Sequence, residues 1–324
     1  MLIKVRSILY VYLAITFCGV SFGAFGQTYP SQSIKLIVPF SAGGGTDATA
    51  RIIASQLSIS LGQTVIVENH PGAGGTLAET LVSKSPADGY TLLFDAASFG
   101  INPAIRTVPF DPKKDFIPIA LVMTTPNILV VRSGSPFTTL KDFLAYANAN
   151  PGKLTFASPG AGTGQFLSGE LFNIRTNAEL LHVPYKGGGP AIIDLIGGQV
   201  DCYFANGASA TPFINDGKLV PLGVTSAKRS QFFPNVPTFM EQGIPDYDVK
   251  EWAGIFAPAG TSNLIVEKIA SEIRKALKDP RVLTGMQRIG VTPETNTPAE
   301  FSKFVDSELA RWSMLVTKYK IKTE

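Results

Sequence analysis

Cysteine and histidine are scarce in this chain, which limits the chemistry it can support. The 324 residues include two cysteines, Cys18 and Cys202, and two histidines, His70 and His182. Clusters of these residue types hold many protein-bound metals, and spacings such as H-E-x-x-H do not occur here. The sequence therefore predicts no metal and no cofactor. Cys202, in the apolar run QVDCYFAN, is expected to be a buried thiol.

The chain also lacks a large excess of positive or negative charge. Charged residues make up 16% of the chain, with 28 Lys and Arg against 25 Asp and Glu. Nucleic-acid-binding domains usually carry a dense basic patch, so this composition predicts no nucleic-acid partner. With 45% hydrophobic residues, the chain is long enough for a large core divided between about two domains.

Long apolar runs are missing except at the N-terminus. There, Lys4 and Arg6 precede an uncharged, mostly apolar run over residues 8–26 that ends in small residues. This is the pattern of a secretory signal peptide, with cleavage expected after Gly26, and a retained membrane anchor is the alternative. Cys18 follows Phe17, a poor match to a lipoprotein site, so we place it in the discarded segment 1–26. The mature protein is then expected in the periplasm.

Short β-rich runs alternate with glycine-rich turns and amphipathic helices. Strands are expected over residues 34–40, 64–68, 90–94, 116–123, 127–132, 154–157, 180–184, 200–204 and 219–225. Helices are expected near residues 48–61, 76–84, 139–149, 165–171, 191–198, 263–277, 281–289 and 298–320. The alternation predicts an α/β fold with parallel sheets, and its recurrence on either side of about residue 125 predicts two similar lobes.

Four glycine-rich turns each follow a predicted strand and precede a predicted helix. They are Ser41–Asp47, His70–Thr76, Ser158–Gln165 and Tyr185–Pro190. Ligands of open α/β sheets bind beyond the carboxyl ends of the strands, where free N–H groups and the helix dipole favour an anion. For any single turn, an ordinary strand-to-helix connection explains the glycines equally well. Four in one chain favour a bound anion.

The four turns lack the motifs that bind nucleotide phosphates. A P-loop needs a lysine after its last glycine, but Gly43-Gly44-Gly45 is followed by Thr46 and Asp47. None of the turns fits the G-x-G-x-x-G fingerprint well, and exported proteins rarely meet free nucleotides. A small carboxylate fits better, with Asp47 capping the helix that follows.

Catalytic motifs are weak or absent, so we predict no catalytic residue. There is no G-x-S-x-G elbow and no Cys/His cluster. A Ser-His hydrolase built on Ser158 and His182 is the alternative, although His182, in LLHVPY, is more simply a structural residue. Lys186 is either a cation of the site or a solvated loop lysine.

The turns and their flanking segments resemble a known family along nearly the whole mature chain. The segments that carry the resemblance include PFSAGGGTD, VENHPGAGG, DGYTLLF, FDPKKDFIPIALV, ASPGAGTG, VPYKGGGPAIIDLIGGQVD and WAGIFAPAGT. In this order they resemble the Bug-type (TctC-like) solute-binding receptors of tripartite tricarboxylate transporters.

The resemblance implies the fold and the partners. The fold would be that of a type II periplasmic binding protein, in which two parallel-sheet α/β lobes are joined by hinge strands and close on a ligand. Lobe 1 would comprise residues 27–125 and 250–324, and lobe 2 residues 126–249. The ligand would be a small carboxylate and the partners the membrane permease subunits, with a sensor protein as an alternative partner. Trp252 would lie near the hinge and report closure.

The resemblance also implies that one loop from each lobe holds the ligand carboxylate. The predicted ligand-binding residues are Phe40, Ser41, Ala42, Gly43, Gly44, Thr46, Asp47, Asp95, Ser98, Ser158, Gly162, Thr163, Gly164, Gln165, Phe166 and Asn206. Phe166 stands where the family usually has histidine, and His70 where it usually has arginine. Asp95 would favour a ligand with an amine or hydroxyl donor, or else it caps the next turn. Ligand selection is expected from Phe40, Asp95, Phe166 and Asn206.

Overall fold

A computed structural model describes residues 29–321, so the predicted signal peptide lies outside the described residues. Every element below lies in one compact unit that begins at Gln32. Within residues 29–321, each helix is either too short or too polar to span a membrane.

Strands and helices alternate over most of this unit. The strands are β1 (Ile34–Val38), β2 (Val65–Asn69), β3 (Thr91–Ala96), β4 (Phe116–Arg132), β5 (Thr155–Ser158), β6 (Leu181–Pro184), β7 (Cys202–Asn206), β8 (Leu219–Val224), β9 (Lys250–Pro258) and β10 (Thr292–Pro293). The helices are α2 (Gly45–Leu61), the 3-10 turn η1 (Ala73–Gly75), α3 (Thr76–Ser83), α4 (Ser98–Ile105), α5 (Leu140–Ala149), α6 (Gly164–Thr176), α7 (Gly188–Ile196), α8 (Gly207–Asn215), α9 (Asn263–Ala276), α10 (Pro280–Arg288) and α11 (Pro298–Tyr319).

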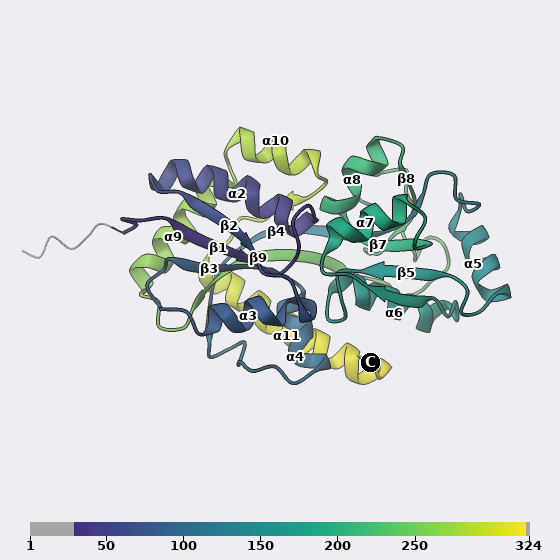
Figure 1. The fold of residues 1–324 in the computed structure, drawn as a ribbon, viewed down its shortest axis with the longest axis horizontal. Helices are drawn as coiled ribbons and strands as arrows, with labels where there is room; N and C mark the ends of the chain where they lie inside the picture. The colour runs from purple at the N-terminus through teal and green to yellow at the C-terminus, as the bar shows by residue number, and fades with distance from the viewer. Residues whose placement is uncertain (1–28, 322–324) are drawn as a thin grey trace, which may run out of the picture. The chain divides into compact units, whose positions relative to one another are not determined.

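The strands form two groups joined by long antiparallel strands. Their order is β2-β1-β3-β9-β4-β7-β5-β6, with β8 and β10 also paired to β4. The sets β2-β1-β3 and β7-β5-β6 are parallel, as predicted, whereas β9 and β4 are antiparallel to their neighbours. Figure 1 shows β4 and β9 running side by side between the two groups.

Strand β4 passes from one group to the other. The sequence predicted two strands here, but residues Phe116–Arg132 form one strand of 17 residues. It pairs with β9 up to Pro126 and with β7 and β8 from Asn127 onward. Pro126 lacks an N–H donor, and proline usually interrupts the hydrogen bonds between strands. For this reason the sequence predicted two separate strands. Strand β9 was not predicted, because eight consecutive buried residues from Glu251 onward show no alternation.

Helices α5, α9 and α11 each begin after a residue whose side chain caps the helix. Thr139 and Ser262 accept hydrogen bonds from the backbone of α5 and α9, and Thr297 forms a reciprocal capping box with Glu300 at α11. Trp252 was expected in the hinge or cleft region. It pairs with Thr124 of β4, close to where β4 changes partners, and its ring is buried against Phe256, Phe301 and Phe304. Whether its fluorescence reports closure stays a prediction.

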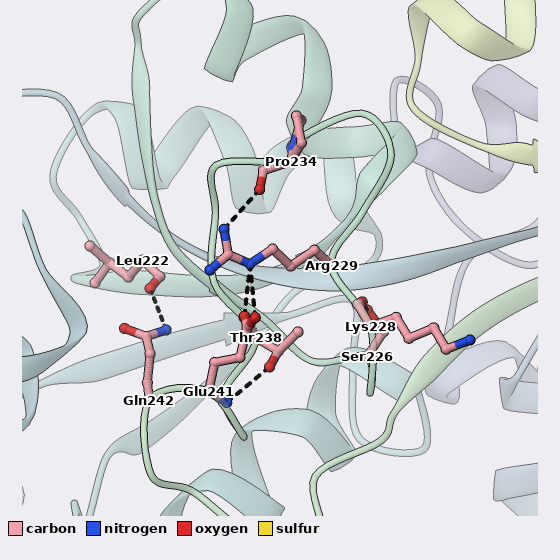
Figure 2. A network of polar contacts seen from close by, with 8 residues as sticks. All are labelled: Leu222, Ser226, Lys228, Arg229, Pro234, Thr238, Glu241 and Gln242. Atoms are coloured by element: carbon pink, nitrogen blue, oxygen red, sulfur yellow. Dashed lines mark hydrogen bonds and ion pairs between the residues drawn. The ribbon is translucent and has the colours of Figure 1, made fainter.

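The segment between β8 and β9 has little regular structure and is held by side-chain contacts instead. Figure 2 shows the Arg229 guanidinium between the Glu241 carboxylate, with Nε to Oε2 at 2.9 Å, and the Pro234 carbonyl, also at 2.9 Å. Glu241 in turn accepts from the Thr238 backbone at 2.7 Å. These bonds give the backbone of a long loop the partners that a strand or helix would otherwise supply. Lys228 points away from this network (Figure 2).

Candidate functional site

A small cavity lies where loops from both groups of strands meet. It is lined by Phe40, Gly44, Gly45, Thr46, Ala96, Ser98, Pro159, Thr163, Gln165, Gly188, Tyr203, Asn206, Ser209 and Glu251. Its volume is about 10 Å³, the space of roughly one water molecule. A larger solute can therefore enter only if the two sides move apart.

Five helices begin at this cavity. Lining residues sit at or next to the first residue of α2, α4, α6, α7 and α8, which are Gly45, Ser98, Gly164, Gly188 and Gly207. At a helix N-terminus the first N–H groups have no partner within the helix, and the positive end of the helix dipole lies there. Among the described lining residues there is no lysine, arginine or histidine, so the helix termini are the main source of positive potential.

The two sides of the cavity are in direct contact. The Gly45 backbone N–H of α2 donates to Ser209 Oγ of α8 at 2.8 Å, and the Ser41 N–H donates to the Lys186 carbonyl at 3.0 Å. Arg106 beyond α4 donates to the Ala161 carbonyl at 2.6 Å. Each bond joins a loop or helix that follows β1–β3 to one that follows β5–β7, so the two sides meet directly around the cavity.

Asp47 does not cap its helix as predicted. Helix α2 begins three residues earlier than predicted, at Gly45, and its N-cap is Gly44. Asp47 instead accepts from the Gly43 N–H at 3.0 Å, from Arg51 Nε at 3.1 Å and from Asn69 Nδ2 at 2.9 Å. Burial alone would raise its pKa, but these hydrogen bonds hold the pKa below the usual value. Asp47 therefore stabilises the first loop from behind.

The second loop is shaped by its glycines and by Thr163. Gly162 has φ +96° and a Cβ there would lie 2.2 Å from Asn102 Oδ1, so only glycine fits. Thr163 caps α6 by accepting from the Phe166 N–H at 3.3 Å, and it donates to the Gly160 carbonyl at 2.8 Å. These contacts set the direction in which the first N–H groups of α6 point.

Replacing Thr163 with valine should weaken ligand binding about tenfold and cost about 1 kcal/mol of stability, because the cap that orients α6 is lost. Thr139→Val is the matched control, since Thr139 caps α5 far from the cavity lining. Chemical denaturation and calorimetric titration measure the two effects. Equal affinity losses in both variants would show that the cap acts only through stability.

Ser158 and His182 are within hydrogen-bond distance of each other, as in a serine hydrolase, but the pair lies outside the cavity lining. Ser158 Oγ lies 2.6 Å from His182 Nε2 and accepts the Gly160 N–H at 3.0 Å. The imidazole packs against Phe156 and Phe166, and burial lowers its pKa to about 4, which keeps it neutral. Ser158 is fully buried and is not part of the cavity lining. The pair holds the end of β5 to β6.

We expect Ser158→Ala to lose about 1–2 kcal/mol of unfolding free energy, since two hydrogen bonds disappear. Ligand affinity should change less than tenfold, because the hydroxyl lies behind the lining. An ester-hydrolysis assay on the wild type and the variant checks the alternative. Turnover by the wild type that vanishes in Ser158→Ala would establish a serine hydrolase.

Asp95 was predicted either to select amine or hydroxyl donors or to cap the next turn, and its hydrogen bonds favour the second role. Its Oδ1 accepts from the Ala96 N–H and from Ser98 Oγ, each at 2.7 Å, and the side chain is fully buried. Burial raises its pKa to about 6, and Glu79 lies next to it. The acidic side chain that lines the cavity is Glu251 of β9, which was not among the predicted site residues.

The predicted binding residues thus divide into two sets. Those that line the cavity are Phe40, Gly44, Thr46, Ser98, Thr163, Gln165 and Asn206. Those that lie behind the lining or beside it are Ser41, Ala42, Gly43, Asp47, Asp95, Ser158, Gly162, Gly164 and Phe166. Tyr203 and Glu251 were missed because they sit within strands, and reach the cavity only through strand pairing.

The protein has two α/β groups of strands with a cavity between them that favours an anion. This arrangement is that of the two-lobed solute-binding proteins. Comparison with known proteins identifies the family within this class. A family model described as "Tripartite tricarboxylate transporter family receptor" matches residues 49–321. A UPF0065 protein of Pseudomonas sp. (strain P51) is 39% identical over 297 residues, covering 91% of this chain and 88% of that protein. Protein BugT of Bordetella pertussis is 36% identical over 305 residues, covering 93% and 94%.

Solved structures agree. The periplasmic binding protein BugD is 34% identical with a TM-score of 0.88, over 91% of this chain and 100% of BugD. Rpa4515 of R. palustris, solved with adipate, is 33% identical with a TM-score of 0.87, over 91% and 99%. MatC of Rhodopseudomonas palustris, solved with bound malate, is 34% identical with a TM-score of 0.85, over 89% and 100%.

The chain belongs to the TctC family of tripartite tricarboxylate transporter receptors. The predicted resemblance and the two-lobed α/β fold are confirmed, and the chain is a solute-binding receptor of Bug type.

Proposed function

We propose that this receptor captures a small carboxylate between its two lobes and delivers it to the membrane permease of a tripartite tricarboxylate transporter. The observation that carries the proposal is the meeting of five helix N-termini at one cavity without a basic side chain in its described lining. The adipate and malate of the two related structures belong to the same chemical class.

Hydrogen bonds from backbone N–H groups can supply most of the binding free energy that a small carboxylate needs. A hydrogen bond to a charged acceptor contributes about 1.5–3 kcal/mol, and a helix terminus adds about 0.3–1 kcal/mol. Micromolar affinity requires roughly 8 kcal/mol, so three or four backbone N–H groups supply much of it. We propose that no bond is made or broken, and that the ligand shifts an open-to-closed equilibrium that the permease reads.

The remaining assignments are also proposals. The mature protein would be periplasmic after removal of residues 1–26. Lobe 1 would span residues 27–125 and 250–324, and lobe 2 residues 126–249, in line with the change of partners along β4 at Pro126 and Asn127. A role with a sensor protein is the alternative to transport. Ligand-dependent co-purification with the permease subunits or with a sensor protein separates the two.

A thermal-shift screen tests the proposed ligand class. We expect at least one acid from a panel containing malate, adipate, succinate and aspartate to raise the melting temperature. At 100 times its Kd a ligand adds about 2.7 kcal/mol of stability. Sugars and divalent cations serve as the comparison set. A shift produced only by that set would overturn the proposal.

A further inference from the structure

The carboxyl group of Glu251 is placed to take part in ligand binding. It lines the cavity and its residue is 1% exposed. Oε1 accepts from the Ala97 N–H at 3.0 Å, whereas Oε2 has no hydrogen-bond partner among residues 29–321. Oε2 faces the start of α6, since a Cβ on Gly164 would lie 2.5 Å from it. A buried carboxyl oxygen without a partner therefore points at the helix end proposed to hold the ligand.

The surroundings of Glu251 disfavour a negative charge. Burial is the main cause that raises its pKa to about 8, and the nearby carboxylates Asp95 of β3 and Glu308 of α11 act in the same direction. Glu79 of α3 lies beyond Asp95, and the Glu308 carboxylate is paired with Arg311. At neutral pH, Glu251 is accordingly a carboxylic acid with an O–H to donate.

We propose that Glu251, in its neutral form, donates a hydrogen bond from its carboxylic acid to the bound carboxylate, so that ligand capture requires one proton on the protein. The proposal rests on the proposed function and identifies the side chain that selects for an anionic oxygen at this position. An ammonium group there would instead require Glu251 to be ionised. The site therefore favours hydroxy acids and simple dicarboxylic acids over amino acids.

The sign of the pH dependence follows from linkage. An anionic ligand beside Glu251 raises the pKa of that group further, so the complex holds the proton to a higher pH than the free protein does. Affinity is then constant below about pH 8 and falls up to tenfold per pH unit above it. Tyr203, the other titratable lining residue, does not interfere, because burial raises its pKa well above this range.

Calorimetric titration from pH 6.5 to 9.5 with malate, adipate and aspartate tests this inference. Malate and aspartate form a matched pair that differs in a hydroxyl against an ammonium group. We expect wild-type affinity for malate or adipate to fall above pH 8, and malate to bind more tightly than aspartate. Glu251→Gln should bind about tenfold more weakly at pH 7, because an amide is a weaker donor, and should show no pH slope.

Asp95→Asn is the control for a buried acid outside the lining. It should keep the slope but begin it at a lower pH, since one nearby negative charge is gone. A wild-type profile that is flat to pH 9.5, or a slope that persists in Glu251→Gln, would overturn the inference. Aspartate affinity that rises with pH would assign Glu251 the opposite role, as an ionised acceptor.

A measurement without ligand keeps the inference separate from the proposed function. Carbon NMR of glutamate-labelled protein, with the Glu251 carboxyl assigned from its absence in Glu251→Gln, gives the titration midpoint directly. We expect a midpoint near pH 8. A midpoint below pH 6 would overturn the inference even if acids bind. Failure of every acid to bind would instead refute the proposed function.

Discussion

Gly45→Ala should abolish tight ligand binding while leaving the unliganded protein folded. A Cβ at Gly45 would lie 2.2 Å from Asn206 Oδ1 and 2.7 Å from the Cβ of Ala208, both across the cavity. Asn206 cannot move freely, since its Oδ1 accepts from the Ser209 N–H at 2.8 Å and caps α8. Overpacking costs about 1–3 kcal/mol, so affinity should fall roughly 10- to 100-fold.

In the absence of ligand, Gly45→Ala should be slightly more stable than the wild type. Gly45 lies in α2 at a non-positive φ, where alanine is a better helix former, so the open form gains about 0.4–1 kcal/mol. Gly197→Ala is the matched control, because a Cβ there would come no closer than 3.4 Å to its nearest neighbour, the Ile193 carbonyl oxygen. Calorimetry measures the ligand affinity of both variants, and chemical denaturation measures their unfolding free energy. Wild-type affinity in Gly45→Ala would show that the closed contact is not needed.

The second large effect is on stability as a function of pH: the unfolding free energy should fall as pH rises from about 5 to 8. Burial raises the pKa of Glu79, raises that of Asp95 to about 6, and raises that of Glu251 to about 8. Between the unfolded and folded pKa values, the native state binds more protons than the unfolded state. Each such proton removes about 1.4 kcal/mol of stability per pH unit as pH rises.

Glu79→Gln tests this directly, because the amide keeps the acceptor for Asn102 Nδ2, now at 3.2 Å from Oε1, but cannot ionise. We expect the variant to be more stable than the wild type at pH 8 and to show a shallower slope in urea unfolding. Glu267→Gln, at an exposed site on α9, should change neither quantity. Stability that rises from pH 5 to 8 in the wild type would contradict the account.

Much of the fold could be predicted from the sequence because the signals are local. Glycine turns mark the starts of α2, α6 and α7, and short apolar runs mark β1 and β5. The passage of β4 between lobes was missed, since which partner a strand pairs with is not a local property. Pro126 looked like a boundary between strands, whereas it lies inside one that changes partners.

The site was predicted in part for the same reason. Glycine-rich loops mark where helices begin, so Gly44, Thr46 and Thr163, which line the cavity, could be predicted; that they bind a ligand stays a prediction. Glu251 and Tyr203 lie in strands far along the chain, and only pairing brings them to the cavity. One sequence signal could have indicated Glu251: it is a lone acid at the head of the otherwise apolar run WAGIFAP.

The most direct test of a carboxylate-binding cavity compares an acid with its neutral isostere. The acid that gives the largest thermal shift is titrated calorimetrically into the wild-type protein, alongside the corresponding primary amide. If helix N-termini and a neutral Glu251 hold an anion, the acid should bind at least about 100-fold more tightly than the amide, since charged-acceptor hydrogen bonds are roughly twice as strong as neutral ones. Equal affinity for the acid and the amide would contradict the account.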